Sequence, residues 1–237
     1  MTYPSASAGE KWAKMDIIVG GGKYGCMAVE YLRKKRRGFV VVDKDPNCLA
    51  VKKYKLKTAF DIDVEGEHFI QGEIATVSQL IGRLKPEYVF PTAPIHVAAE
   101  LAQSKFKLAP WDEAINYILA NLPPSVILRA GKGNLIVSYN RDKDCVEKCE
   151  APEVCPSTHT RKPCTMDRLM KFACPESFIL ISHQLTPGLG ALKNNELLEF
   201  LDWVEKKEKF VVATACACHG FFTAFKKVPR DKAKEKS

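Results

Sequence analysis

The chain has 237 residues and a formal net charge of +8, with 46% hydrophobic and 27% charged residues. This length and composition indicate a globular protein with one large domain or two small ones, and they exclude a disordered or fibrous chain. No stretch approaches the length of a membrane span, and the first 14 residues lack the apolar core of a signal peptide. We therefore expect a cytoplasmic protein with no membrane partner.

Much of the excess positive charge lies in two runs of the sequence. Residues 33–37 end a predicted helix, where cations suit the helix dipole. Residues 226–237 form a lysine-rich tail that we expect to be disordered. Because no basic stripe with interleaved aromatic residues is present, nucleic acid is not an expected partner.

Residues 15–43 predict a strand, a glycine-rich turn, a helix and a second strand. In order, these are Met15–Val19, a turn in which Gly20, Gly22 and Gly25 fit G-x-G-x-x-G, a helix over 23–37, a strand over 39–42, and Asp43 at its end. This arrangement is typical of dinucleotide-binding sites, in which the pyrophosphate lies at the helix N-terminus.

Each glycine of this turn has an expected purpose. Gly20 permits the tight turn, Gly22 lets the pyrophosphate approach the backbone, and Gly25 lets the helix pack closely on the strand. The loop and the first helical turn, with Gly21, Lys23 and Tyr24, complete the expected phosphate contacts. The alternative is a glycine turn that binds no ligand.

Strands and helices alternate over residues 15–128, which predicts an α/β fold with a parallel sheet covered by helices on both faces. The order GGGKYG, VVVD, FIQGEI and EYVFPTAP resembles the nucleotide-binding domains of potassium-uptake regulators (TrkA N-terminal type) and of saccharopine-dehydrogenase-like enzymes. The resemblance covers about half of the chain. It implies a Rossmann-like, doubly wound domain that binds NAD or NADP.

The resemblance also implies which residues contact the cofactor. It assigns the adenosine ribose to Asp43, and Lys44 beside it leaves the choice between NAD and NADP open. It assigns contacts with the adenine region to Gly72 and Glu73, at the place where these families have Gly-Asp. Thr92 and Pro94 are the remaining expected cofactor-binding residues.

From these patterns we expect four segments. They are a flexible leader over 1–14, the nucleotide-binding domain over 15–130, a cysteine-rich α/β segment over 131–225, and the basic tail over 226–237. Within the third segment, a glycine turn at 130–134 predicts a hairpin, and residues 178–215 predict a further strand–helix–strand unit.

Seven of the nine cysteines lie beyond residue 144. Cys145, Cys149, Cys155 and Cys164 have the spacing C-x3-C-x5-C-x8-C in a segment, 140–176, that has no helical or strand periodicity. Four thiolates suit a 4Fe–4S cluster or a zinc ion. The wide, uneven spacing favours the cluster, because structural zinc sites usually contain C-x2-C pairs. Zinc and a loop without metal remain alternatives.

A second group follows the strand predicted at 210–215 and consists of Cys216, Cys218 and His219. His183 holds the matching place after the strand predicted at 178–182. If both strands extend the nucleotide-binding sheet, these residues face the nicotinamide and act as ligands or as a nucleophile with its base. The alternative is buried structural cysteines and a structural histidine.

The sequence therefore predicts an NAD(P)-binding redox protein with a cysteine-ligated iron–sulfur cluster, acting on a small-molecule substrate or a redox partner protein. One alternative is an NAD(H)-sensing regulatory module with a structural zinc or cluster. Another is an enzyme with Cys216 or Cys218 as nucleophile. The sequence leaves open whether the chain forms a homodimer.

Overall fold

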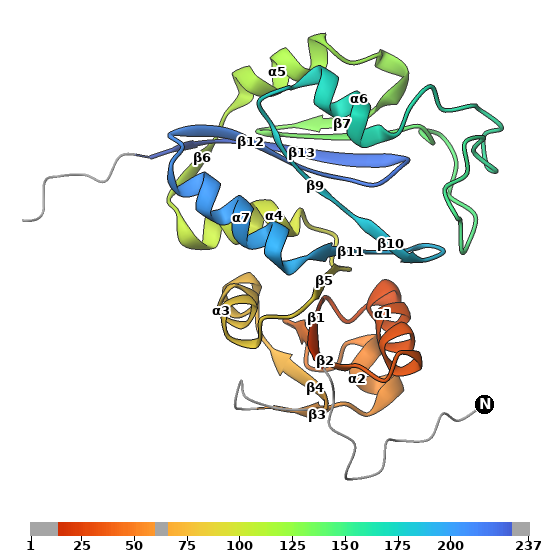
Figure 1. The fold of residues 1–237 in the computed structure, drawn as a ribbon, viewed down its shortest axis with the longest axis vertical. Helices are drawn as coiled ribbons and strands as arrows, with labels where there is room; N and C mark the ends of the chain where they lie inside the picture. Colours follow the sequence, from red (N-terminus) through yellow and green to blue (C-terminus); the bar gives the residue numbers. More distant parts are fainter. Residues whose placement is uncertain (1–13, 60–65, 229–237) are drawn as a thin grey trace, which may run out of the picture. The chain divides into compact units, whose positions relative to one another are not determined.

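The computed structural model describes residues 14–59 and 66–228 of a mixed α/β protein (Figure 1). The chain divides after Ala93 into two compact units. The alternation of strands and helices predicted a boundary near residue 130 instead. Of the expected leader, only Lys14 is described. Of the expected tail, Lys226 and Lys227 belong to the last strand, and residues 229–237 lie outside the described part.

The first unit contains a parallel sheet with the strand order β5-β1-β2-β4-β3. Its elements are β1 (Met15–Val19), α1 (Lys23–Lys34), β2 (Gly38–Asp43), α2 (Leu49–Tyr54), β3 (Lys57–Thr58), β4 (Glu67–Gln71), α3 (Ile74–Leu84) and β5 (Tyr88–Pro91). Figure 1 shows α1 and α2 on one side of this sheet and α3 on the other. The central strands are buried on both faces, which explains their continuous apolar runs.

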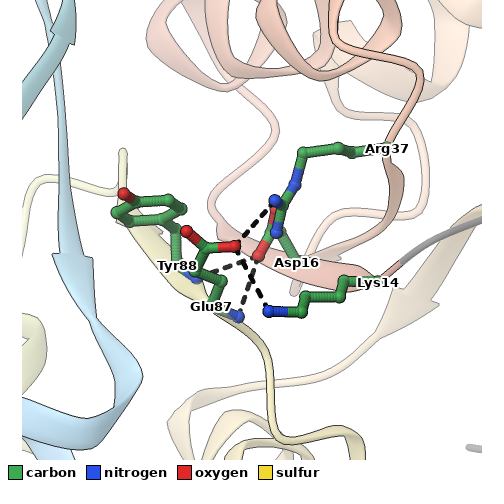
Figure 2. Close-up of polar contacts among 5 residues, drawn as sticks. All are labelled: Lys14, Asp16, Arg37, Glu87 and Tyr88. Carbon is green, nitrogen blue, oxygen red and sulfur yellow. Dashed lines mark hydrogen bonds and ion pairs between the residues drawn. The ribbon is translucent and has the colours of Figure 1, made fainter.

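One acidic residue interrupts the apolar run of β1. Asp16 is fully buried and accepts hydrogen bonds from Arg37 Nε (2.6 Å) and from the backbone N–H groups of Glu87 (3.1 Å) and Tyr88 (2.9 Å) (Figure 2). Arg37 also donates to Glu87 (2.8 Å), which Lys14 approaches at 3.6 Å. Burial raises the pKa of Asp16, while Arg37 and the two backbone donors act to lower it. The carboxylate thus ties the start of β1 to the starts of β2 and β5.

The second unit contains a six-stranded sheet in the order β7-β8-β13-β12-β9, with β6 paired to β13. Its elements are α4 (Val97–Lys105), β6 (Leu108–Pro110), α5 (Asp112–Ala120), a 3₁₀ turn (Pro124–Val126), β7 (Ile127–Gly131), β8 (Asn134–Ser138), α6 (Met166–Ala173), β9 (Phe178–Ile181), β10 (His183–Thr186), β11 (Leu189–Lys193), α7 (Asn194–Glu205), β12 (Lys209–Ala215) and β13 (His219–Lys227). Figure 1 shows α5 and α6 on one face of this sheet and α4 and α7 on the other.

The expectation of a single parallel sheet over residues 15–128 is wrong for its last strands. β6 pairs antiparallel with β13, and β7 pairs antiparallel with β8, so both belong to the second unit. The predicted hairpin is confirmed as β7 and β8. The predicted strand–helix–strand unit is also confirmed, because β9 and β12 are parallel with α7 between them. The β10–β11 hairpin, which was not predicted, is inserted in the same connection.

The second sheet buries its own apolar core. The side chains of Ile118, Leu135, Val137, Met166 and Phe222 are completely buried in it. The C-terminal ends of the parallel strands β9 and β12 lie side by side, since Ala215 pairs with Ile181. The turn that follows β12 therefore begins beside the β9–β10 junction. Within the described residues, no helix has the length and apolar character needed to cross a membrane.

Candidate functional site

The glycine turn after β1 shows why glycine is needed at its positions. Gly20 has a φ of +104°, and a Cβ atom there would lie 2.8 Å from the Ala93 nitrogen. A Cβ atom on Gly25 would clash with the Gly20 carbonyl oxygen. At Gly22, by contrast, no heavy atom of the described residues, apart from its chain neighbours, lies within 4 Å of the Cβ position. Gly20 and Gly25 are therefore fixed by packing, while the backbone at Gly22 is open to a ligand.

Asp43 ends β2 beside this turn. Its Oδ2 accepts a hydrogen bond from the Gly21 N–H (2.6 Å), and its Oδ1 accepts one from the Asp45 N–H (2.9 Å). Each oxygen keeps a lone pair for a further donor. Cys48 packs against Gly21, and burial raises the pKa of the Cys48 thiol, as expected for an unreactive cysteine.

The other predicted cofactor residues of the first unit lie at the same edge of the sheet. Thr92 follows β5 and donates its hydroxyl to the Gly20 carbonyl (2.8 Å), which fixes the turn. The Gly72 N–H donates to the Asp43 carbonyl (3.0 Å), and Glu73 is the N-cap of α3. Tyr24, in the first turn of α1, is 55% exposed. Lys23 is the first residue of α1, and Lys44, directly after Asp43, is exposed. Pro94 belongs to the second unit.

In the second unit, the turn between β12 and β13 holds Cys216, Cys218 and His219. Cys216 Sγ accepts backbone hydrogen bonds from Cys218 (3.5 Å) and His219 (3.3 Å), and it lies 3.5 Å from His219 Nδ1. Burial raises the pKa of Cys216, but these hydrogen bonds and His219 bring it below the usual value. The turn therefore favours the thiolate form of Cys216 more than an ordinary environment does.

The expectation that residues 140–176 lack helical periodicity is wrong at their end, where Met166–Ala173 form the amphipathic helix α6. The segment between β8 and α6 (139–165), which we call the cysteine-rich segment from here on, folds back onto the β12–β13 turn. Cys145 Sγ lies 3.5 Å from His219 Nε2, so the imidazole sits between Cys145 and Cys216. The Met166 N–H donates to the Ala217 carbonyl (3.1 Å), and the Tyr139 N–H donates to the Cys218 carbonyl (3.0 Å). The cysteine-rich segment thus meets the turn at its beginning and at its end.

A buried lysine joins the two segments at a further point. Lys162 is 7% exposed and donates to Cys218 Sγ (3.1 Å) and to the Ala151 carbonyl (2.9 Å). The Ala151 N–H in turn donates to Cys149 Sγ (3.3 Å). Burial raises the pKa of Cys218, and the neighbouring Cys216 and Cys149 raise it further, against the Lys162 ammonium. Cys149 therefore lies near enough to Cys218 for a charge on it to raise the pKa of the Cys218 thiol.

The predicted metal set of Cys145, Cys149, Cys155 and Cys164 is only partly brought to this turn. Cys164 lies nearby, with its sulfur 3.7 Å from the Tyr139 hydroxyl. Cys155 is buried in a small turn of its own, where its backbone pairs with His159 and Thr160. Burial raises the pKa of Cys155, but hydrogen bonds within this turn bring it below the usual value. Over residues 14–59 and 66–228, no three His, Cys, Asp or Glu side chains form a closed metal-ligand group.

The predicted histidine of the β9 edge has another partner. His183 begins β10 and its Nε2 lies 3.1 Å from Glu196 on α7, so its side chain is engaged away from the cysteines. The expectation that β9 and β12 extend the nucleotide-binding sheet is wrong, because both belong to the six-stranded sheet. The sheet to which β9 and β12 belong is set by pairing between strands that are distant in sequence, and local patterns do not encode that pairing. Lys162 and Tyr139 were missed, since nothing in their sequence context marks them.

Two family models match the chain, and their boundary falls close to the division seen in the structure. A family described as "Uncharacterized protein, N-terminal domain" (AF_1314 N-terminal) matches residues 15–97. Another, described as "Uncharacterized protein, C-terminal domain" (AF_1314 C-terminal), matches residues 98–228, which is more than half of the chain. The chain belongs to the AF_1314 family. A relative from Archaeoglobus fulgidus, described as "Uncharacterized protein", is 51% identical over 215 residues, covering 90% of this chain and 100% of that protein.

Proposed function

We propose that this protein is an NAD(P)-binding redox protein that carries a cysteine-ligated 4Fe–4S cluster. In this proposal it is an oxidoreductase acting on a small molecule or on an electron-transfer partner. The observation that carries the proposal is the convergence of Cys145, Cys149 and Cys164 on the Cys216–Cys218 turn of the second unit. Five thiols, a histidine and a buried lysine gather at one end of one sheet. Apolar packing alone does not explain this group, because the buried ammonium of Lys162 is costly without polar partners.

The nucleotide part of the proposal rests on the first unit, which we propose to be a Rossmann-like, doubly wound domain similar to those of the TrkA type. Its parallel strands end at one edge with the glycine turn, Asp43 and Gly72, where nucleotides bind in open α/β sheets. The open backbone at Gly22 leaves room for a pyrophosphate at the N-terminus of α1. The carboxylate of Asp43 suits ribose hydroxyls.

The metal part rests on the character of the sulfur atoms. Hydrogen bonds to sulfur stabilise thiolates and tune iron–sulfur clusters. Cys145, Cys149, Cys216 and Cys218 each accept an N–H donor, from Asn140, Ala151, the turn backbone and Lys162 respectively. Zinc remains the alternative metal, and elemental analysis separates the two.

The test uses the full chain purified without oxygen. We expect a brown protein with about four iron and four sulfide per chain, and binding of NAD(H) or NADP(H) measured by calorimetry. Zinc without iron would contradict the cluster, and the absence of heat with any of the four nucleotides would contradict the nucleotide site. Oxidation of NADH or NADPH with an added acceptor would favour an enzyme over an NAD(H)-sensing module.

A second candidate function is supported by the contact between Cys216 and His219. The 3.5 Å separation of Sγ from Nδ1 and the lowered pKa of Cys216 are features of an activated cysteine nucleophile. In that case metal-free protein would be alkylated by iodoacetamide at Cys216 first, and His219→Gln would slow this step. Equal alkylation rates in both proteins would exclude the nucleophile.

A further inference from the structure

The predicted metal centre drew all four ligands from the cysteine-rich segment. We infer instead that Cys145 and Cys149 of this segment and Cys216 and Cys218 of the β12–β13 turn are the four ligands of one iron–sulfur cluster. This inference rests on the proposed function, because it assigns the ligands of the cluster proposed there. It is argued from the contacts within the second unit.

The turn between β12 and β13 supplies the fixed half of the site. Two cysteines separated by a single residue follow the buried strand β12, and the turn is closed by the Cys216 N–H bond to the His219 carbonyl (3.0 Å). The backbone N–H groups of Cys218 and His219 point at the Cys216 sulfur. This is how a tight turn holds a thiolate before metal arrives.

The cysteine-rich segment supplies the other half, and it is anchored at the cysteines themselves. The Cys149 carbonyl accepts hydrogen bonds from Gln184 Nε2 (2.7 Å) and from the Gly188 N–H (3.1 Å), both on the β10–β11 hairpin. Cys145 is held by Asn140 Nδ2 (3.4 Å) and by His219. The Oδ1 atom of Asn140 is buried and has no hydrogen-bond partner among the described residues, as expected beside a ligand site.

Lys162 places a positive charge between the two halves of the site. Burying an ammonium is costly unless it is paired, and the side chain to which this one donates is the Cys218 thiol rather than a carboxylate. Its bonds to Cys218 Sγ and the Ala151 carbonyl bridge the turn and the segment. An ammonium cannot ligate a metal, so Lys162 serves as a fixed positive charge that offsets the charge of four thiolates.

The two remaining cysteines of the segment, Cys155 and Cys164, have other hydrogen-bond partners. Cys155 is 8% exposed, and the backbone of its own turn supplies its hydrogen bonds. The Cys164 sulfur faces the hydroxyl of Tyr139. Among the described residues the four assigned sulfurs do not form a closed ligand group, and we expect metal binding to complete it.

The experiment measures iron and sulfide in anaerobically purified full-length variants. We expect Cys145→Ala, Cys149→Ala, Cys216→Ala and Cys218→Ala each to lose iron by roughly tenfold or more, since even residues that only support ligands cost that much. Cys155→Ala is the matched control and keeps the wild-type content. Circular dichroism and nucleotide binding by the first unit report whether each variant is folded.

A second measurement avoids variants that fail to fold. Wild-type holoprotein is alkylated before and after its iron is removed with a chelator under anaerobic, reducing conditions, and mass spectrometry locates the modified thiols. We expect the four assigned thiols to be protected only while iron is present. Retention of iron in a Cys216 or Cys218 variant, or protection of Cys155 or Cys164 instead, would overturn the assignment.

The outcomes separate this inference from the proposed function. Iron with a different set of protected cysteines overturns the ligand assignment alone. Zinc held by the same four cysteines overturns the cluster but leaves the four-cysteine site in place. Wild-type protein without any metal overturns both.

Discussion

The histidine at the start of α4 gives a prediction about stability and pH. His96 is buried between two threonines of the second sheet, with Nδ1 2.7 Å from Thr223 Oγ1 and Nε2 2.9 Å from Thr214 Oγ1. Its ring stacks on Phe221 at a centroid distance of 4.6 Å. Burial lowers the pKa of His96 to about 3. The adjoining helix N-terminus also disfavours a positive ring.

The magnitude follows from proton linkage. In the unfolded chain the imidazole has a pKa of about 6.5, so at pH 5 it is about 97% protonated, while native His96 remains neutral. The unfolded state binds the extra proton, so stability is complete above pH 6.5 and falls as the pH drops toward 3. Between pH 7.5 and pH 5, His96 alone removes about 2 kcal/mol from the free energy of unfolding.

The assay compares wild type with His96→Gln by urea unfolding at pH 7.5, 6.3 and 5. The glutamine costs stability at neutral pH, but it does not titrate, so the difference between the two proteins shrinks by about 2 kcal/mol at pH 5. The other titrating groups are the same in both proteins, so their contributions to the free energy of unfolding cancel in the difference. His159→Asn, at an exposed position, is the control and should follow the wild-type curve. Parallel curves for wild type and His96→Gln would refute the reasoning.

Three further predictions concern the two units. Gly22→Asp places a carboxylate where the pyrophosphate is proposed to lie and should abolish NAD(H) binding in calorimetry, while Gly82→Asp, at an equally open and exposed position of α3, should leave it unchanged. Lys162→Met removes a buried positive charge and should lower the reduction potential of the cluster in a spectroscopic titration, with recovery in Lys162→Arg; an unchanged potential would contradict the proposed role. Asp16→Asn breaks a buried ion pair and should cost about 3 kcal/mol in urea unfolding, whereas Glu30→Gln, in an exposed pair, should cost less than about 1 kcal/mol.

The first unit was largely predictable because its signals are local. A glycine pattern, a helix of 12 residues and an apolar strand ending at Asp43 lie within about 30 consecutive residues, and the structure has each of them. Asp16 was not predicted as part of a network, since its partners are supplied by the starts of β2 and β5. A carboxylate in an apolar run reveals its partner only when the strands are aligned.

The second unit was less predictable because its pairings join distant parts of the chain. The short strands β6 and β7 look the same in sequence whether they continue a parallel sheet or join an antiparallel one. The contacts of the cysteines were unpredictable for the same reason. Spacing along the chain grouped Cys155 with Cys145, whereas the fold places Cys145 beside His219, 74 residues away. Only the positions of β12 and β13 bring those residues together.

The way the cysteine-rich segment is held is a further argument for the proposed metal. It has a single isolated β-bridge, between Val154 and Arg161, and Val146 and Val154 are each nearly half exposed, so apolar packing contributes little. Its backbone is tied to the rest of the unit at Cys149, by the β10–β11 hairpin, and at Tyr139 and Met166, by the β12–β13 turn. The attachment points are thus at or beside the thiols. A metal that joins those thiols would strengthen the segment where it is already held, because binding to the native state adds directly to its stability.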